Sequence, residues 1–240
     1  TNESLVEMIS FFIPIRKASK RVINKNTRPL PGFKVGLTEI KVNQLMKFQQ
    51  LVKKRNPKLF KKFEFIVSTN CKKVKKFVKN FRWIKVHNRK NSLSTDDSLD
   101  KLCKEVPDIC NGKYILWTHV TSPKFNENDY FNFLSDFFKK NTKKKLEQSA
   151  FSADKLQKFV FSIKDKWISH NTSKKKWPRT QDLSKFYTAN SAVFFATAKT
   201  YYKYQDRLCN KPTPIVSRKQ SGYDIDDLND FKMFQKELRK

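Results

Sequence analysis

The sequence is short of acidic residues, with 22 Asp and Glu against 52 Lys and Arg among 240 residues. Its formal charge of +30 at pH 7 brings nucleic acids and anionic membranes to mind as partners. Most of the cations, however, are lysines in short scattered clusters, whereas arginine is favoured for reading phosphates and bases. We therefore interpret the surplus as a solvated surface and expect no nucleic-acid partner, although an enzyme with polyanionic substrates fits the same charge.

Long hydrophobic runs are also missing. No apolar stretch approaches the roughly 20 residues that a membrane helix needs, so we expect no membrane partner. The N-terminal stretch lacks a basic start followed by an apolar segment, and we expect no secretory signal. None of the four cysteines forms a C-x-x-C pair, and the three histidines do not pair with them at metal-ligand spacing. These features argue against zinc and favour reduced thiols in a cytoplasmic protein.

Apolar runs alternate with segments of helical period along the chain. The expected strands are 11–15, 63–68, 83–86, 114–120, 191–196 and 213–217. The expected helices are 38–54, 72–78, 97–106, 127–140, 197–204 and 228–239, with Thr38 as the N-cap of the first. This alternation predicts an α/β fold whose mostly parallel sheet is flanked by helices. We expect one domain over residues 1–240, with a small β-rich lobe inserted at about 150–186 as a flap or dimer arm.

Concentrated positive charge follows the first strand, in the stretch "IRKASKRVINKN" at 15–26. Ligands of parallel α/β sheets bind beyond the carboxyl ends of the strands, where this loop would lie. The loop offers cationic, hydroxyl and amide donors: Arg16, Lys17, Lys20, Arg21, Lys25, Ser19, Asn24 and Asn26. Charge-assisted hydrogen bonds from these groups would match a triphosphate of roughly four negative charges. On charge alone, an ordinary basic surface loop remains the alternative.

A pair of carboxylates stands out near the C-terminus of this acid-poor chain. In an extended segment, residues two apart point to the same side, so Asp224 and Asp226 would project together. Two carboxylates together with phosphate oxygens suit Mg²⁺. The alternative is that Asp226 or Asp227 only caps the helix that follows.

The loop stretch "IPIRKASKRVINKN" resembles the pattern I-P-A-R-G-G-S-K-G-x-P-x-K-N of the acylneuraminate cytidylyltransferase family, the CMP-sialic acid synthetase-like enzymes. The matching residues are Ile13, Pro14, Arg16, Ser19, Lys20, Lys25 and Asn26. Lys17, Ala18 and Arg21 replace the three glycines of the family pattern, which suggests that side-chain cations take over part of the phosphate contact.

Further resemblances follow in the family's order, so that together they cover about residues 11 to 238. "VSTN" (67–70) resembles V-S-T-D with Asn70 for the acid, and "LSTDDS" (93–98), with Arg89 upstream, resembles the segment that meets the cytosine. "THVTSP" (118–123) resembles L-Q-P-T-S-P, with His119 in place of Gln. "RTQDLSKFYTANSAVFF" (179–195) resembles R-R-Q-D-L-P-x-x-Y-x-x-N-G-A-I-Y-I, with Ser191 for Gly. "YDIDDLNDF" (223–231) resembles I-D-I-D-T-x-x-D-L.

The resemblance implies a Rossmann-like nucleotidyltransferase fold and a reaction of CTP with a sialic-type keto sugar acid that gives CMP-sugar and pyrophosphate. It implies a homodimer, with Mg²⁺ held by Asp224 and Asp226, and catalysis that also uses Arg16 and Lys25. The implied nucleotide-binding residues are Arg16, Ser19, Lys20, Lys25, Asn26, Arg89 and Ser98. The implied residues for the sugar acid are His119, Thr121, Ser122, Arg179, Gln181, Tyr187 and Asn190.

Other interpretations stay open at this point. The acceptor could be an eight-carbon ulosonic acid of the KDO type. The missing glycines and Asn70 would also fit a catalytically degenerate homologue, and the charge would fit a basic nucleic-acid-binding protein. His119 could be an ordinary hydrogen-bonded core histidine, and Arg179 part of an exposed basic cluster.

Overall fold

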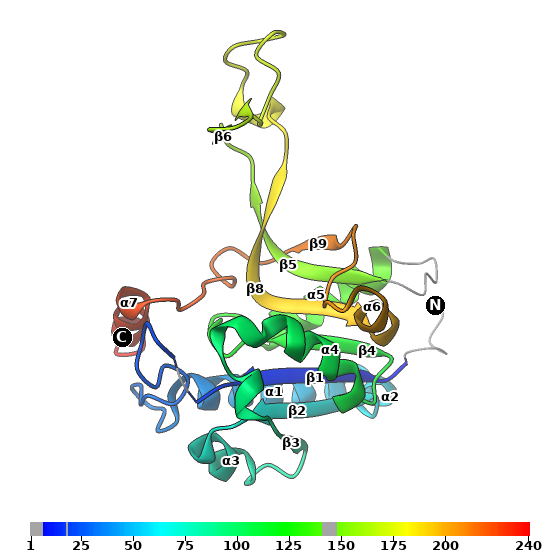
Figure 1. The fold of residues 1–240 in the computed structure, drawn as a ribbon, viewed down its shortest axis with the longest axis vertical. Coiled ribbons are helices and arrows are strands. Elements are labelled where there is room, and N and C mark those ends of the chain that lie inside the picture. The colour runs from blue at the N-terminus through cyan, green and yellow to red at the C-terminus, as the bar shows by residue number, and fades with distance from the viewer. Residues whose placement is uncertain (1–6, 18, 141–147) are drawn as a thin grey trace.

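A seven-stranded sheet forms the centre of the molecule. The computed structural model describes residues 7–17, 19–140 and 148–240. The strands lie in the order β3-β2-β1-β4-β8-β5-β9 (Figure 1). Their bounds are β1 Ile9–Ile15, β2 Phe63–Thr69, β3 Ile84–Asn88, β4 Tyr114–Thr118, β5 Ser149–Leu156, β8 Phe186–Thr197 and β9 Thr213–Val216.

Most neighbouring strands of this sheet run parallel. β1 pairs in parallel with β2 and β4, β2 with β3, and β5 with β9. β8 is antiparallel to both β4 and β5. The predicted α/β class with a mostly parallel sheet is confirmed. Because β1, β2, β3 and β4 are mutually parallel, the loops that follow them meet at one edge of the sheet.

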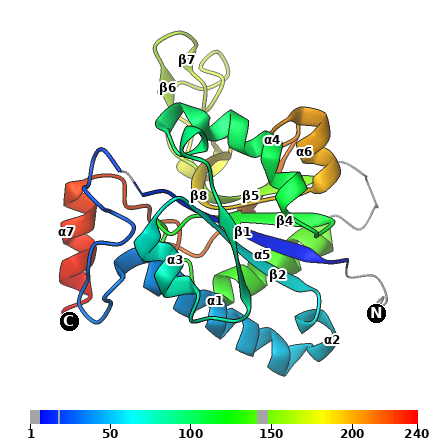
Figure 2. The same cartoon turned by 60° about the horizontal axis from the view of Figure 1, so that its bottom comes forward.

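Helices cover both faces of the sheet, as Figure 2 shows. Apolar side chains of α1, α3, α5 and α7 join the larger core on one face, and those of α4 and α6 pack on the other. The helix bounds are α1 Gly36–Arg55, α2 Pro57–Phe60, α3 Lys72–Val78, α4 Leu99–Ile109, α5 Glu127–Lys140, α6 Ala198–Tyr204 and α7 Leu228–Glu237. None of the helices in the described ranges is both long and apolar enough to cross a membrane.

Most expected elements are present with ends that differ by three residues or fewer, but the prediction for Thr38 was wrong. Helix α1 begins at Gly36, and its N-cap Val35 makes no side-chain capping bond. The Thr38 hydroxyl instead donates to the Asn26 carbonyl at 2.7 Å. The short helix α2 was missed, although its signals were present: Asn56 caps it by accepting from the Leu59 N–H, and Pro57 opens it.

An arm projects from the body between β5 and β8 (Figure 1). At its end lie β6 (Phe161–Ser162) and β7 (Lys166–Trp167), which pair with each other. The expected core strand at 191–196 is confirmed as the buried half of β8, but the strand begins earlier than expected, at Phe186. The ladder of β8 with β5 starts at Phe186, so one strand runs from the arm into the sheet.

The strand β8 is bulged where the arm joins the body. The pairing shifts register between Phe151 and Ala153, and Ser191 has a left-handed backbone with φ of 61°. The Ser152 hydroxyl accepts from the Val193 N–H at 2.9 Å and donates to Asn190 Oδ1 at 2.6 Å, replacing ladder bonds lost at the bulge. Ser191 stands where the cytidylyltransferase pattern has glycine, the residue that adopts this conformation most easily.

Replacing Ser191 by Gly is expected to raise the free energy of unfolding by about 0.5–1 kcal/mol. Relief of left-handed strain outweighs the greater chain entropy that glycine gives to the unfolded state. Denaturant titration of the wild type, Ser191→Gly and Ser191→Ala measures this, because alanine keeps the Cβ atom. A glycine variant no more stable than the alanine variant would contradict the strain.

Candidate active site

A cavity of about 600 Å³ lies at the carboxyl edge of the sheet, where the loops after β1, β3 and β4 meet the segment before α7. Many of the predicted site residues line it. They are Arg16, Ser19, Lys20, Lys25, Asn26, Arg89, Ser98, His119, Thr121, Asp224 and Asp226. The folded chain thus brings together groups that are more than 200 positions apart.

The loop after β1 is fixed at its end by the side chain of Asn26. Asn26 Nδ2 donates to the Arg16 carbonyl at 3.1 Å, which closes the loop on itself. The Asn26 carbonyl accepts from both the N–H and the hydroxyl of Thr38. It thereby satisfies one of the free N–H groups at the start of α1 and anchors the loop to that helix. Asn26 Oδ1 is buried without a partner.

Lys25 connects this loop to the acidic segment. It is 8% exposed, and its Nζ donates to the Ile225 carbonyl at 2.6 Å. Burial lowers the pKa of Lys25, while the nearby Asp224 and Asp226 carboxylates oppose that shift. Its ammonium group is therefore fixed between the cationic loop and the carboxylates, at the wall of the cavity.

The acidic segment alternates as predicted for an extended chain. Ile225 is fully buried in the core, and its N–H donates to the Thr121 carbonyl at 2.8 Å. Asp224 and Asp226 on either side both line the cavity. Asp227 caps α7 in a capping box with Asp230, so capping falls to the residue after the pair.

The two carboxylates of the segment have different surroundings. Asp224 Oδ1 is buried without a hydrogen-bond partner. Burial raises the pKa of Asp224, and Asp226 adds to this, whereas a hydrogen bond from Thr121 and the charge of Lys25 oppose it. Asp226 is more exposed and forms an ion pair with Arg21, Oδ1 to Nη2 2.9 Å.

Arg89 lines the same cavity and carries unpaired hydrogen-bond donors. It is 7% exposed, and its Nε and Nη2 are buried without hydrogen-bond partners. Burial lowers the pKa of Arg89 to about 10, and the charge of Arg16 contributes. Such donors are costly to bury unless a ligand supplies acceptors. The hydroxyls of Ser94, Thr95 and Ser98 line the cavity with it.

Arg207 also lines the cavity, and the sequence analysis missed it. It follows α6, and its guanidinium carbon lies 3.6 Å from the ring centre of Phe194 and 5.1 Å from that of Trp117. Its Nη1 lies 3.4 Å from His119 Nε2, which also accepts from the Trp117 indole N–H at 3.0 Å. Burial lowers the pKa of His119 to about 3, helped by Arg207, so the ring is neutral. No motif marked position 207, since its role depends on the packing of distant aromatic residues.

The turn after β4 is supported from α1 by a buried lysine. Lys41 Nζ donates to the Ser122 carbonyl at 3.1 Å and to the Tyr130 hydroxyl at 2.9 Å. Ser122 itself is fully buried and does not line the cavity. Burial lowers the pKa of Lys41 to about 7, while Asp129 opposes the shift. Ser122 thus contributes a carbonyl to the support of the turn.

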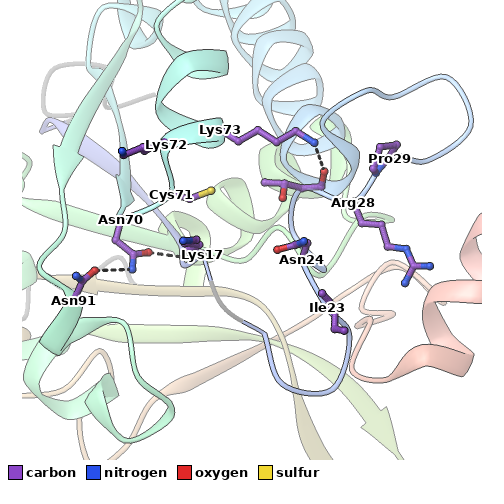
Figure 3. A pocket seen from close by; sticks show the side chains of 11 residues that line it. Lys17, Ile23, Asn24, Arg28, Pro29, Asn70, Cys71, Lys72, Lys73 and Asn91 are labelled. Atoms are coloured by element: carbon purple, nitrogen blue, oxygen red, sulfur yellow. Dashed lines mark hydrogen bonds between the residues drawn. The ribbon is translucent and has the colours of Figure 1, made fainter.

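A second cavity of about 790 Å³ lies on the other side of the loop after β1 (Figure 3). Asn70 stands at its edge: Oδ1 accepts from the Lys17 N–H at 2.9 Å and Nδ2 donates to Asn91 Oδ1 at 3.1 Å. Lys73 Nζ donates to the Thr27 carbonyl at 2.9 Å. Asn70 and Lys73 thus hold the loop after β1 on this side through two hydrogen bonds, which we call the clamp. Asn70 replaces an acid of the family pattern.

Besides Ser122, four more predicted substrate residues do not line the cavity in this chain. Arg179, Gln181 and Tyr187 are on the arm, where Arg179 pairs with Asp182 at 3.2 Å. Asn190 is buried at the base of the arm and bonds to Ser152 and to Ser217. Within one chain, the arm therefore adds none of these side chains to the cavity.

Two of the three positions where the family pattern has glycine do not demand glycine in this chain. Neither Lys17 nor Arg21 has a left-handed backbone, and Ala18 lies outside the described residues. Asn24, the loop residue with φ of 55°, is of a type that tolerates this conformation.

The chain belongs to the cytidylyltransferase family, whose model matches residues 10–236. This is a family of CTP-dependent nucleotidyltransferases. No curated protein matches the chain.

Solved structures of similar fold span nearly the whole chain. A CMP:2-keto-3-deoxy-manno-octonic acid synthetase, solved with CTP, is 13% identical with a TM-score of 0.60, covering 97% of this chain and 98% of that one. A 4-diphosphocytidyl-2C-methyl-D-erythritol synthase from Anaerococcus prevotii is 14% identical with a TM-score of 0.63, covering 98% and 97%. A nucleotidyl transferase from Methanothermobacter is 12% identical with a TM-score of 0.58, covering 97% and 98%. At these identities the likeness shows the fold alone.

Asn70→Ala is expected to weaken CTP binding about fivefold, because it removes one hydrogen bond of the clamp, worth about 1 kcal/mol. Asn70→Asp should bind CTP nearly as the wild type does, since a carboxylate still accepts from the Lys17 N–H. Calorimetric titration with CTP measures both variants. Equal affinities of the wild type and Asn70→Ala would contradict the clamp.

Lys41 makes the stability depend on pH. Above pH 7 the folded protein holds Lys41 neutral while the unfolded chain still binds the proton, so stability rises with pH up to the unfolded pKa. The unfolding free energy of the wild type minus that of Lys41→Met should increase between pH 7 and 10, by at most about 1.4 kcal/mol per pH unit. Lys47→Met, on the exposed side of the same helix, is the control. Its unfolding free energy should depend on pH in the same way as that of the wild type. A constant difference for Lys41→Met would contradict the assignment.

Proposed function

We propose that the protein transfers the cytidylyl group of CTP to the anomeric hydroxyl of a sialic-type keto sugar acid, releasing pyrophosphate. The observation that carries the proposal is the convergence of Arg16, Lys25, Asp224 and Asp226 on one cavity. Cations for a triphosphate and carboxylates for a metal lie within one pocket, connected by the bond from Lys25 to the acidic segment.

The proposed reaction needs positioning and charge neutralisation more than covalent work by the protein. Arg16 and Lys25 hold the β- and γ-phosphates and stabilise the negative charge of the departing pyrophosphate. Ser19, Lys20 and Asn26 complete the phosphate loop. The unpaired donors of Arg89 and the hydroxyl of Ser98 bind the nucleoside. The acceptor hydroxyl, held near His119 and Thr121, attacks the α-phosphorus opposite the pyrophosphate.

Asp224 and Asp226 fit a bound Mg²⁺. The buried Oδ1 of Asp224 has no partner, and a hard oxygen is the ligand this ion prefers. No group of three or more His, Cys, Asp or Glu side chains suited to a metal occurs in the described ranges, so phosphate oxygens and water would complete the coordination. When bound, the ion would polarise the α-phosphate and lower the pKa of the attacking hydroxyl. Arg21 would release one oxygen of Asp226.

The proposed active form is a homodimer in which each arm reaches the neighbour's cavity. The arm exposes large apolar side chains, with Ile163 98%, Trp177 66% and Phe161 57% exposed. Such patches are typical of interaction surfaces. A dimer of this kind would bring Arg179, Gln181 and Tyr187 to the cavity of the partner chain.

An eight-carbon ulosonic acid is the second candidate acceptor. It is supported by the structural similarity to the CMP:2-keto-3-deoxy-manno-octonic acid synthetase. The stretch 179–195 favours a sialic-type acid. Pyrophosphate release with CTP and Mg²⁺ across sialic, legionaminic, pseudaminic and eight-carbon acids separates the candidates. Release with none of them, although CTP binds, would contradict the proposed reaction.

Asp226→Asn is expected to lower turnover at least about 100-fold while the fold stays intact, because the active site loses one of its two metal-binding carboxylates. Pyrophosphate release and the Mg²⁺-dependent part of the thermal shift with CTP are the measurements. Asp100→Asn, on the exposed first turn of α4, removes the same charge as a control. Unchanged turnover and an unchanged Mg²⁺ response in Asp226→Asn would show that the metal site is elsewhere.

A further inference from the structure

We infer that Arg207 binds the carboxylate of the acceptor and so makes the enzyme select an acid; this rests on the proposed function. Position 207 was not among the residues that the family resemblance marked. Three observations support it: Arg207 lines the cavity, aromatic rings and His119 hold its guanidinium, and no carboxylate of the described residues forms an ion pair with it.

Arg207 lines the part of the cavity that the proposed position of the nucleotide does not fill. The loop after β1 takes the triphosphate, and Arg89 with the hydroxyls of 94–98 takes the nucleoside. Apart from the aspartate pair, the other residues with polar side-chain groups that line the cavity are Trp117, His119, Thr121, Ser191 and Arg207. An acceptor whose hydroxyl reaches the α-phosphorus must lie against these residues.

The guanidinium is held in a defined orientation. Its carbon lies 3.6 Å from the ring centre of Phe194, and the indole of Trp117 is the second aromatic neighbour. Nη1 donates to Nε2 of the neutral His119. A flat cation packed on aromatic rings loses little side-chain freedom when it binds a ligand. Arg207 lines the cavity, and the forked N–H groups of a guanidinium match a carboxylate in two parallel bonds.

The charge of the neighbouring Asp206 acts on this guanidinium and opposes the lowering of the Arg207 pKa by burial. Throughout the part of the chain that the structure describes, no carboxylate forms an ion pair with Arg207. A partly buried cation that has no carboxylate in an ion pair with it is stabilised when an anion binds beside it. A guanidinium fork matches both carboxylates and phosphates, and the carboxylate is the anionic group that the proposed acceptor offers.

The role also explains His119. The single lone pair of its Nε2 is shared between the Trp117 indole N–H at 3.0 Å and Arg207 Nη1 at 3.4 Å, so the ring lies against the guanidinium and limits its orientation. His119 is then a positioning residue for the arginine.

Arg207→Met tests the inference, because methionine keeps an apolar stem against Phe194 and removes the charge. The probes are N-acetylneuraminate and the eight-carbon acid, each compared with its methyl ester. Their affinities are measured by calorimetry in the presence of a CTP analogue with a methylene group between the α- and β-phosphates. The wild type should bind each acid about 10- to 100-fold more tightly than its ester. Arg207→Met should bind acid and ester alike, with an unchanged affinity for the CTP analogue.

Arg207→Lys, which keeps the charge and loses the fork, should recover part of the preference for the acid. Arg82→Met, an exposed arginine before β3 on the opposite edge of the sheet, is the matched control and should behave as the wild type. Circular dichroism and melting curves verify that each variant folds. If Arg207→Met does not fold, the acid-to-ester ratio of the wild type still decides, since equal binding of both overturns the inference.

The remaining outcomes separate the inference from the proposed function. An acid preference retained in Arg207→Met overturns the inference and leaves cytidylyl transfer intact. Binding of neither acid at millimolar concentration also overturns it. If 2-C-methylerythritol 4-phosphate binds in an Arg207-dependent way and the acids do not, the inference that Arg207 binds a carboxylate is overturned. Arg207-dependent acid binding without pyrophosphate release supports the inference and contradicts the proposed reaction.

Discussion

The bond between the Lys25 ammonium and the Ile225 carbonyl is the constraint on which the site depends. It joins residues 200 positions apart and connects the loop after β1 to the segment before α7. Ile225 is anchored by burial and by its bond to the Thr121 carbonyl. One short segment therefore contacts both the phosphate loop and the turn after β4. Asp224 and Asp226 face the cavity because Ile225 between them faces the core.

The wall of the cavity contains more buried cations than carboxylates. Lys25, Arg89 and Arg207 are wholly or partly buried in its wall, and burial lowers the pKa of each. Asp224 and Asp226 are the carboxylates that line this wall, and Asp226 is already paired with Arg21. An anionic nucleotide adds negative charge beside these cations, so ligand binding and the stability of the fold are linked. Most of the remaining lysines of the chain are scattered away from the cavity, which separates the overall charge of +30 from the charge that acts in the site.

Sequence patterns predicted the elements and the residues with local signatures. Alternating apolar runs are enough to locate β1 and α5, because burial imposes their periods, and adjacent motifs placed Arg16, Lys25 and the aspartate pair. Arg207 could not be predicted from the sequence, since its position depends on Phe194 of β8 and Trp117 of β4. The continuity of β8 was also missed, because its exposed first half reads as a turn-rich polar segment. Thr38 has the chemistry of an N-cap, but its hydroxyl bonds to Asn26 of the loop instead.

The unbroken course of β8 has a mechanical consequence. The same strand carries Tyr187 on the arm, Ser191 at the cavity wall and Phe194 beneath the Arg207 guanidinium. On this side, no irregular segment separates the arm from the sheet, because β8 is continuous from Phe186 to Thr197. A displacement of the arm would reach the bulge at Ser191 through the same strand. Contacts made by the arm would therefore change the position of the cavity wall beside the acceptor.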